Sequence, residues 1–291
     1  MNPAPSVIIF TVLSGMGLGY LALLATAHDY SGMAAFWHWA FGYALATIGL
    51  MASAFHLGNP QRALLAFTQW RTSWLSREAW GAVLTLLAFA PLALSDWLGL
   101  GLPRGFGWLG AGLALATVLA TGMIYAQIRA VPRWHHWTVP LLFLGFAVAG
   151  GCLLAGFRWP ALAALVVLGG AMVLHWRIGD GAFARAGSTM ASATGLGRPG
   201  AVTVFEPAHT AGNYLLREMI HVVGRRHAAK LRAIALGLGA VLPALALLVL
   251  PGVAAFGVAL VLHLLGALAQ RWLFFAEAEH VVGLYYGARG A

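Results

Sequence analysis

The chain has 291 residues, of which 61% are hydrophobic and only 9% are charged. These proportions exclude an ordinary soluble domain, in which about a quarter of the residues carry a charge. The few charges are unbalanced, because 17 Lys and Arg residues outnumber 8 Asp and Glu and give a formal net charge of +9. Such a balance points either to nucleic acid or to an anionic membrane surface, and the positions of the charges decide between them.

The apolar residues gather in long continuous stretches that match the roughly 20 residues of a membrane-spanning helix. We therefore expect an all-α integral membrane protein, a bundle of about eight transmembrane helices that forms one membrane-anchor domain over residues 1–291. The predicted spans are 6–27, 33–57, 77–98, 106–128, 137–157, 159–178, 231–250 and 252–286.

Local sequence signals refine this outline. Pro160 predicts a tight turn between the fifth and sixth spans, and Pro251-Gly252 predicts another between the last two. The last span is longer than a bilayer requires, so its C-terminal part is expected to tilt or to leave the membrane. No basic residues precede the first span as they would in a cleavable signal peptide, so we expect this span to be retained. Cys152 lies in an apolar stretch and is interpreted as a core residue.

Only one connection between predicted spans is long, the loop 179–230. Its first half is rich in Gly, Ser and Thr and is expected to be irregular. Its second half, from residue 213, predicts an amphipathic helix with Leu215, Met219 and Val223 on the apolar face. Such a helix could lie along the bilayer surface or against a partner subunit. The alternative is a basic extension of the seventh span.

The basic residues lie mainly in the loops after the second, fourth and sixth spans, whereas Arg104, Arg158 and Arg289 are assigned to the opposite side. Because cytoplasmic loops carry an excess of Lys and Arg, we expect a bacterial inner-membrane protein with these loops in the cytoplasm and both termini in the periplasm. This distribution over membrane-adjacent loops also argues against nucleic-acid binding. The residues on the basic side are Arg62, Arg71, Arg77, Arg129, Arg133, Arg177, Arg185, Arg198, Arg217, Arg225, Arg226, Lys230 and Arg232.

Polar residues gather where the second and third spans meet the basic side. His56 ends the second span and Glu78 begins the third. Ionisable side chains in membrane segments are costly and are therefore candidates for function. Quinone reduction takes up two electrons and two protons; His56 is suited to a quinone carbonyl and Glu78 to proton transfer. The sequence predicts a quinone site and proton relay formed by His56, Glu78, Arg62, Arg71, Trp70, Trp74, Ser73 and Arg77.

In this site the tryptophans would flank the quinone ring, and Arg62 or Arg71 would stabilise a quinol anion. A purely structural interpretation is also open. In it Ser76 is the N-cap of the third helix, and Glu78 interacts favourably with the helix dipole.

A second polar cluster, formed by Arg271, Glu277, Glu279 and His280, lies near the end of the last span. Arg271 and Phe275 are four residues apart, and Glu277 and His280 are three apart, so each pair is expected to share a helix face. The cluster is either a buried structural ion pair of Arg271 with a carboxylate or a second proton path or quinone contact.

Eleven histidines bring haem b into consideration. Two histidines at matching depth would have to face each other across the haem. No histidine pair recurs at a haem-like spacing within one predicted helix, so haem b is not favoured and no metal is expected. The histidines inside or near predicted spans are His38, His56, His175, His263 and His280.

The run IGLMASAFHLGNPQRA, followed by SWLSREAWGA, resembles the membrane-anchor subunit of the dimethyl sulfoxide reductase type, found in complex iron–sulfur molybdoenzymes. The similarity extends to PSVIIFTVLSGMGLGY and RWLFFAEAEHVVGLYYG and so covers most of the chain. In that family the matching His and Glu are implicated in quinol binding, which the resemblance carries to His56 and Glu78.

The resemblance also implies partners and cofactors. The anchor would bind ubiquinone or menaquinone and no metal. On its cytoplasmic side it would hold an iron–sulfur subunit with four clusters and a catalytic subunit with molybdenum bis(guanine dinucleotide). The loop 179–230 is an insertion relative to reductase-type anchors, and we interpret it as a docking platform for the iron–sulfur subunit.

Within the family, QWRTSWLSREA, IYAQIRAVPRWHH and FEPAHTAGNYLLREM look most like the anchor of cytoplasm-facing, membrane-bound sulfite dehydrogenase. This implies sulfite oxidation to sulfate with quinone reduction. The alternative is an anchor of a dimethyl sulfoxide or polysulfur-compound reductase that oxidises quinol, because the anchor's chemistry is reversible. A haem b-bearing anchor and a standalone transporter are less favoured, the latter because transporters tend to place ionisable groups near the midplane.

Overall fold

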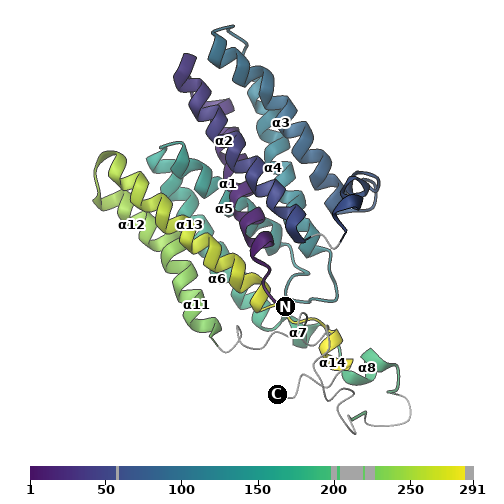
Figure 1. The fold of residues 1–291 in the computed structure, drawn as a ribbon. Helices are drawn as coiled ribbons and strands as arrows, with labels where there is room; N and C mark the ends of the chain where they lie inside the picture. Colours follow the sequence, from purple (N-terminus) through teal and green to yellow (C-terminus); the bar gives the residue numbers. More distant parts are fainter. Residues whose placement is uncertain (57–58, 198–201, 204–218, 220–226, 286–291) are drawn as a thin grey trace.

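The computed structural model describes residues 1–56, 59–197, 202–203, 219 and 227–285, with only the backbone of His56 and Pro60. The described elements are all helical (Figure 1). The longer helices are α1 (Pro5–Ala27), α2 (Gly32–Ala52), α3 (Trp74–Leu98), α4 (Gly105–Ala126), α5 (Thr138–Leu154), α6 (Arg158–Asp180), α11 (Ala228–Leu236), α12 (Leu242–Val249) and α13 (Gly252–Ala276). The short segments are η1 (Ser53–His56), η2 (Pro60–Phe67), α7 (Ala182–Arg185), α8 (Met190–Thr194), the π-helical turn η3 (Gly237–Val241) and α14 (Val282–Tyr285).

Six of the described segments are long and apolar enough to cross a membrane. They are α1, α3, α4, α6, α13 and the continuous segment Ala228–Val249, which joins α11, η3 and α12. The predicted all-α membrane bundle is therefore confirmed. Helix α2 has 21 residues and α5 has 17, and both pack beside α1, but neither meets the same criterion of length and apolarity. The count of eight spans stays a prediction.

Helix α1 lies inside the bundle, between α2 and α5, and glycine makes this position accessible. A Cβ on Gly17 would lie 2.9 Å from the Cα of Ala46 in α2, and a Cβ on Gly19 would lie 2.8 Å from the carbonyl carbon of Ala147 in α5. Real side chains do not approach a backbone this closely. Small residues at such contacts let membrane helices approach each other closely, which increases van der Waals packing in a solvent where hydrophobicity favours no association.

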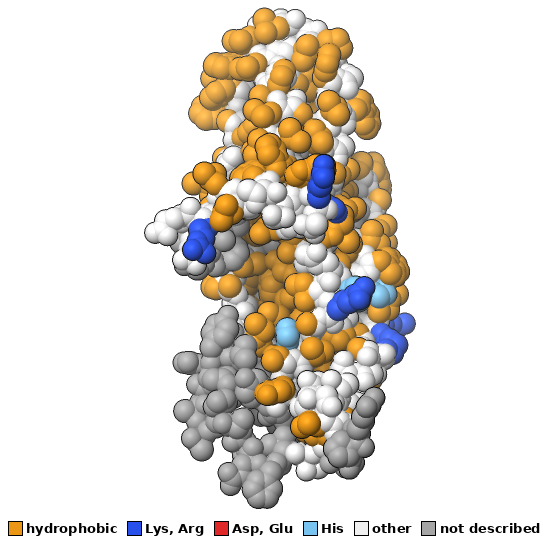
Figure 2. All heavy atoms as spheres, turned by 90° about the vertical axis from the view of Figure 1, so that its right-hand side faces the viewer, with side chains coloured by type: hydrophobic (Ala, Val, Ile, Leu, Met, Phe, Trp, Pro, Cys, Tyr) orange, Lys and Arg blue, Asp and Glu red, His pale blue; other side chains and the backbone are white. Residues whose placement is uncertain are grey.

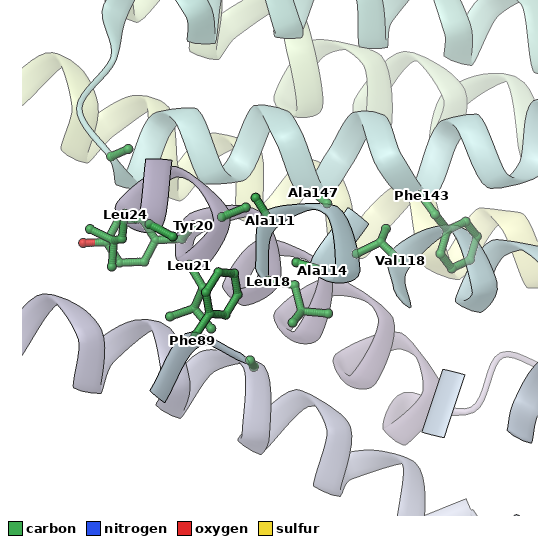
Figure 3. Close-up of a cluster of buried hydrophobic side chains, with 14 of the residues drawn as sticks. Leu18, Tyr20, Leu21, Leu24, Phe89, Ala111, Ala114, Val118, Phe143 and Ala147 are labelled. Carbon is green, nitrogen blue, oxygen red and sulfur yellow. The ribbon is translucent and has the colours of Figure 1, made fainter. Parts of the chain in front are cut away.

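Large apolar side chains fill the space between these close contacts (Figure 3). The labelled side chains come from α1, α3, α4 and α5 and meet between them. Each of these side chains is at least 93% buried. They are Leu18, Tyr20, Leu21, Leu24, Phe89, Ala111, Ala114, Val118, Phe143 and Ala147.

The turn between α5 and α6 differs from the prediction. Pro160 lies inside the first turn of α6, and the chain reverses through Gly156, which has a φ of +74°. Glycine adopts this left-handed conformation without the steric cost that a Cβ adds. The predicted turn between the last two spans is confirmed, and Gly252 there has a φ of +58°.

The prediction that the N-terminus lies opposite the basic loops is wrong, and the C-terminus itself lies outside the described residues. The amino group of Met1 donates to the carbonyl oxygens of Phe275 (3.0 Å) and Ala278 (2.8 Å) at the end of α13. The amide of Val281 donates to the carbonyl of Ala130, in the loop between α4 and α5 (2.9 Å). Residue 1, this loop and the described C-terminal segment therefore meet at one end of the bundle (Figure 1). The loops after the second and fourth helices return to the starting end of the bundle because an even number of long helices precedes each of them. We call this end the basic end.

The last helix is shorter than predicted. Helix α13 ends at Ala276 rather than near residue 286. The Phe275 and Ala278 carbonyls accept from the Met1 amino group, and Glu277 turns toward arginines of other segments. Contacts with other parts of the chain therefore take the place of the hydrogen bonds that a further turn of α13 would make.

The amphipathic helix predicted from residue 213 lies outside the described residues, apart from Met219 and the segment from His227 onward. Lys230 and Arg232 belong to α11, at the start of the seventh long segment. The first half of the loop contains the short helices α7 and α8 within its described part, so it is not wholly irregular.

We predict that Gly19→Ala destabilises the protein, because the added Cβ would enter the Ala147 backbone. Overpacking of this kind typically costs about 1–3 kcal/mol. Gly112→Ala is the matched control, since a Cβ at this helical position meets nothing within 4 Å. The test is the melting temperature of the purified protein, and equal melting temperatures for the two variants would contradict the close packing of α1.

Candidate functional site

The start of α3 is built by two serines. Ser73 is the N-cap, and its side chain accepts a hydrogen bond from the Ser76 amide (3.5 Å). The Ser76 hydroxyl donates to the Ala66 carbonyl and accepts from the Gln69 amide (3.2 Å). Ser76 therefore ties the η2 segment to α3, and the interpretation of Ser76 as the N-cap is wrong. Glu78 lies beyond the first turn, outside the region where the helix dipole acts most strongly.

Glu78 is directed into the bundle. Its side chain is only 4% exposed, and one carboxylate oxygen accepts a hydrogen bond from the Thr121 hydroxyl of α4. One turn further along α4, Tyr125 interacts electrostatically with Glu78 and also with Arg271 of α13. A carboxyl group in such a place can hold or release a proton close to the basic end.

The other residues of the predicted quinone site lie nearer to the surface. The Arg77 guanidinium donates to the backbone carbonyls of Trp70 (3.1 Å) and Arg71 (2.7 Å) and stacks 4.3 Å above the Trp74 ring. Arg71 lies over the Trp70 ring at 5.4 Å. The structure thus brings these four residues together with the N-cap Ser73.

Glu78 does not join this group of residues at the start of α3. Trp70 is 56% exposed and Arg62 is also exposed, whereas Glu78 is buried on the inner side of α3. His56 ends η1 at the basic end, and its side chain lies outside the described atoms.

Arg271 occupies the interior of the bundle and is 1% exposed. Its guanidinium carbon lies 3.6 Å from the centre of the Phe143 ring, and one nitrogen donates to the Gln270 side chain (3.0 Å). Its Nε has no hydrogen-bond partner, and no carboxylate of the described residues pairs with it. The expected ion pair of Arg271 with a carboxylate is therefore absent from the described part of the chain.

Glu277 instead belongs to a four-residue ion cluster at the basic end, formed by Arg133, Asp180, Arg232 and Glu277. Arg232 lies 2.5 Å from both Asp180 and Glu277, while Arg133 lies 2.8 Å from Asp180 and 3.6 Å from Glu277. Burial raises the pKa of Glu277, and the two arginines oppose this effect. The cluster joins the loop after α4 to α6, α11 and the end of α13.

The predicted helix face shared by Glu277 and His280 does not form, because α13 ends at Ala276. The His280 Nδ1 accepts from the Val282 amide (3.0 Å), and Glu279 follows the helix end and has contacts of its own. The predicted polar cluster is therefore divided in two. Arg271 lies in the core of the bundle, whereas Glu277, Glu279 and His280 follow the end of α13.

The buried histidines are engaged with neighbouring groups. The His263 Nδ1 bonds to the Gly239 carbonyl (2.7 Å), which lacks its usual helical donor because Pro243, four residues later, has no N–H. The His175 Nδ1 bonds to the Thr138 hydroxyl (2.9 Å). Among the described residues, no three His, Cys, Asp or Glu side chains lie together as metal ligands.

Sequence reasoning missed the partners of the candidate residues. Thr121 and Tyr125 have a signal that could have found them, since Thr117, Thr121 and Tyr125 follow one another at intervals of four residues in an otherwise apolar helix. Arg133 and Asp180 have no such signal, because they lie in different segments far apart in the sequence.

The fold and these contacts define a multi-pass helical membrane protein with ionisable groups gathered at one end of its bundle. The model of the DMSO reductase anchor subunit family (DmsC) matches residues 1–277, so the chain belongs to this family. The resemblance found in the sequence is thereby confirmed.

One curated relative covers almost the whole chain. It is a sulfite dehydrogenase subunit of Allochromatium vinosum, 31% identical over 331 aligned residues, which cover 98% of this chain and 99% of the relative. No solved structure matches the chain.

The ion cluster yields a prediction for stability. Glu277→Gln should strongly lower the melting temperature of the purified protein, because removing one partner of a buried ion pair typically costs about 3–5 kcal/mol. Asp180→Asn is the comparison, since its side chain is 50% exposed and exposed pairs contribute about 0–1 kcal/mol. An effect of Asp180→Asn as large as that of Glu277→Gln would contradict the structural role of the buried carboxylate.

Proposed function

We propose that this chain is a quinone-reactive anchor subunit, which passes electrons between a partner iron–sulfur subunit and the quinone pool. The observation that carries the proposal is the buried carboxyl group of Glu78, held by Thr121 near the basic end of the bundle. An ionisable group in a membrane segment is costly and marks a functional site by default.

The chemistry of a quinone suits this position. Its reduction takes up two protons with two electrons, and its oxidation releases them. Glu78 lies little more than one turn inside α3, so a proton has a short path between the carboxyl group and the basic end. Tyr125 lies within electrostatic reach of Glu78 and of the Arg271 guanidinium, so a quinol anion at this place would experience a buried positive charge.

We assign the remaining contacts to quinone to the exposed residues at the start of α3 and to the segment before this helix. Trp70 and Trp74 would contact the ring, and His56 would donate to a carbonyl. The assignment of these residues rests on the predicted site, and it includes Arg62, Arg71, Ser73 and Arg77. No haem is part of this mechanism, and the quinone is ubiquinone or menaquinone.

The reaction proposed for the complex is sulfite oxidation to sulfate with quinone reduction. The similarity to a subunit of a sulfite dehydrogenase supports this substrate. The alternative is quinol oxidation coupled to reduction of dimethyl sulfoxide or a polysulfur compound, which the name of the family supports. In either case the sulfur chemistry takes place in a partner subunit that carries molybdenum.

The partners proposed are an iron–sulfur subunit with four clusters and the molybdenum subunit, both docked on the basic end. The excess of basic residues there supports a cytoplasmic position in a bacterial inner membrane. Because Met1 and the described C-terminal segment lie at the same end, they share this side.

The site assignment is tested with variants of the purified complex. We expect Glu78→Gln to lower quinone-linked turnover about a hundred-fold or more, the range of general acid–base catalysis. Thr121→Val should lower it less, because the carboxyl group loses only the hydroxyl that orients it, and His56→Ala should lower it through the quinone contact. The dye-linked activity of the partner subunits should not change.

Thr85→Val is the matched control for Thr121→Val. Thr85 bonds to Thr117 (3.2 Å) across the same α3–α4 interface without touching Glu78. The site assignment would be contradicted by an unchanged quinone-linked rate in Glu78→Gln, or by equal losses of this rate in Thr85→Val and Thr121→Val.

The direction of electron flow is tested with substrates. The purified complex should reduce a short-chain quinone when sulfite is added, and it should not oxidise the quinol with dimethyl sulfoxide. Turnover with dimethyl sulfoxide or polysulfide but not with sulfite would establish the alternative, while activity with none of the three compounds would exclude both reactions. Metal analysis of the co-purifying subunits should find molybdenum and iron.

A further inference from the structure

A cavity of about 240 Å³ opens at the basic end, between the loop that follows α4 and the turn from α6 to α7. Three arginines and two histidines line it, and no Asp or Glu is among the lining residues. The cationic or titratable side chains are Arg129, Arg133, His135, His136 and Arg185.

Two of the three arginines that line the cavity have no acidic partner among the described residues. Arg133 is paired with Asp180 and Glu277 in the ion cluster. Arg129 and Arg185 make no ion pair with any described residue, and both are exposed. Two guanidinium groups are therefore available to a negatively charged ligand.

The walls are held in place by the protein itself. The Arg185 guanidinium donates to the Ile178 carbonyl at the end of α6, and the His135 Nδ1 bonds to the Ala126 carbonyl (2.7 Å). The His136 Nδ1 bonds to the Thr138 hydroxyl (3.1 Å), which in turn bonds to buried His175. A ligand would thus meet one guanidinium, that of Arg185, and two imidazole rings that are already oriented, which lowers the entropic cost of binding.

The size of the cavity narrows the choice of ligand. Pockets that enclose a drug-sized molecule have volumes of about 300–1,000 Å³, so the 240 Å³ here suits a small anionic group rather than a whole quinone. Guanidinium groups match phosphate-type oxyanions because their planar donors can bind two oxygens at once.

The position of the cavity adds an apolar component. Ile178 and Ala182 contribute to its wall near the end of the membrane-spanning α6. Figure 2 shows one face of the molecule, on which basic and histidine side chains lie among apolar ones and no acidic side chain is visible. Basic pockets between transmembrane helices are a known setting for anionic lipid headgroups.

We propose that this cavity binds a tetrahedral oxyanion of the phosphate type, supplied by the headgroup of an anionic phospholipid or by a free ion. The bound anion would neutralise Arg129 and Arg185 beside the loop after α4. This site is separate from Glu78 and does not depend on the quinone proposal.

The test compares binding of two probes, soluble short-chain phosphatidylglycerol and inorganic phosphate, to the purified complex in detergent. The test variant carries both Arg129→Gln and Arg185→Gln. Its affinity for the bound probe should be about thirty-fold lower than that of the unaltered complex, because each basic side chain near an anionic lipid surface contributes about 1 kcal/mol. Arg177→Gln with Lys230→Gln is the control, since it removes the same charge at the same end without altering a lining residue.

The two probes distinguish the source of the anion. Tight binding of phosphatidylglycerol alone identifies a lipid site, and equal binding of inorganic phosphate identifies a site for a free oxyanion. Arg129→Lys with Arg185→Lys keeps the charge but not the paired donors, so it should bind with intermediate affinity and gives a readout if the glutamine variant does not fold. No binding to the unaltered complex, or equal affinities in the glutamine variant and the control, would overturn the proposal.

Discussion

The arrangement of the bundle depends on the contacts that glycines permit along α1. Gly17 and Gly19 lie two residues apart in the sequence and so face different neighbours, α2 and α5. Because a Cβ at either position would enter a neighbouring backbone, the close approach of α2 and of α5 at these two positions requires glycine. Lipid chains are as apolar as Leu, so this close packing replaces the hydrophobic effect as the force that orders the helices.

The basic end is organised by charge rather than by packing. Arg133, Asp180, Arg232 and Glu277 come from four separate segments and neutralise one another where these segments meet. Their attraction and the amino group of Met1 end α13 and hold the loop after α4 against it. Glu78 is buried near the same end, so the proposed proton site lies close to the proposed docking face for the partner subunits.

The polar residues of the interior follow a different principle. Glu78, Tyr125 and Arg271 come from α3, α4 and α13, and Tyr125 interacts electrostatically with each of the other two. A buried guanidinium without a described carboxylate partner is costly in a membrane, and aromatic rings supply part of its stabilisation through Phe143. The interior of the bundle thus holds a buried acid and a buried guanidinium on different helices, and the proposed proton transfer depends on the first of them.

The sequence by itself determined the fold class and the family and showed which loops are basic, because these follow from apolar stretches, short motifs and loop charges that are local in the chain. It also singled out Glu78, whose role stays a proposal. Only the tertiary structure decided that Thr121 holds Glu78, that Arg133 and Arg232 rather than Arg271 pair with Glu277, and that Met1 lies at the basic end. These contacts join residues from separate helices, and their spacing along the chain carries no sign of them. Hydropathy predicts which segments enter the membrane, whereas close backbone contacts and ion pairs determine which segments pack against each other.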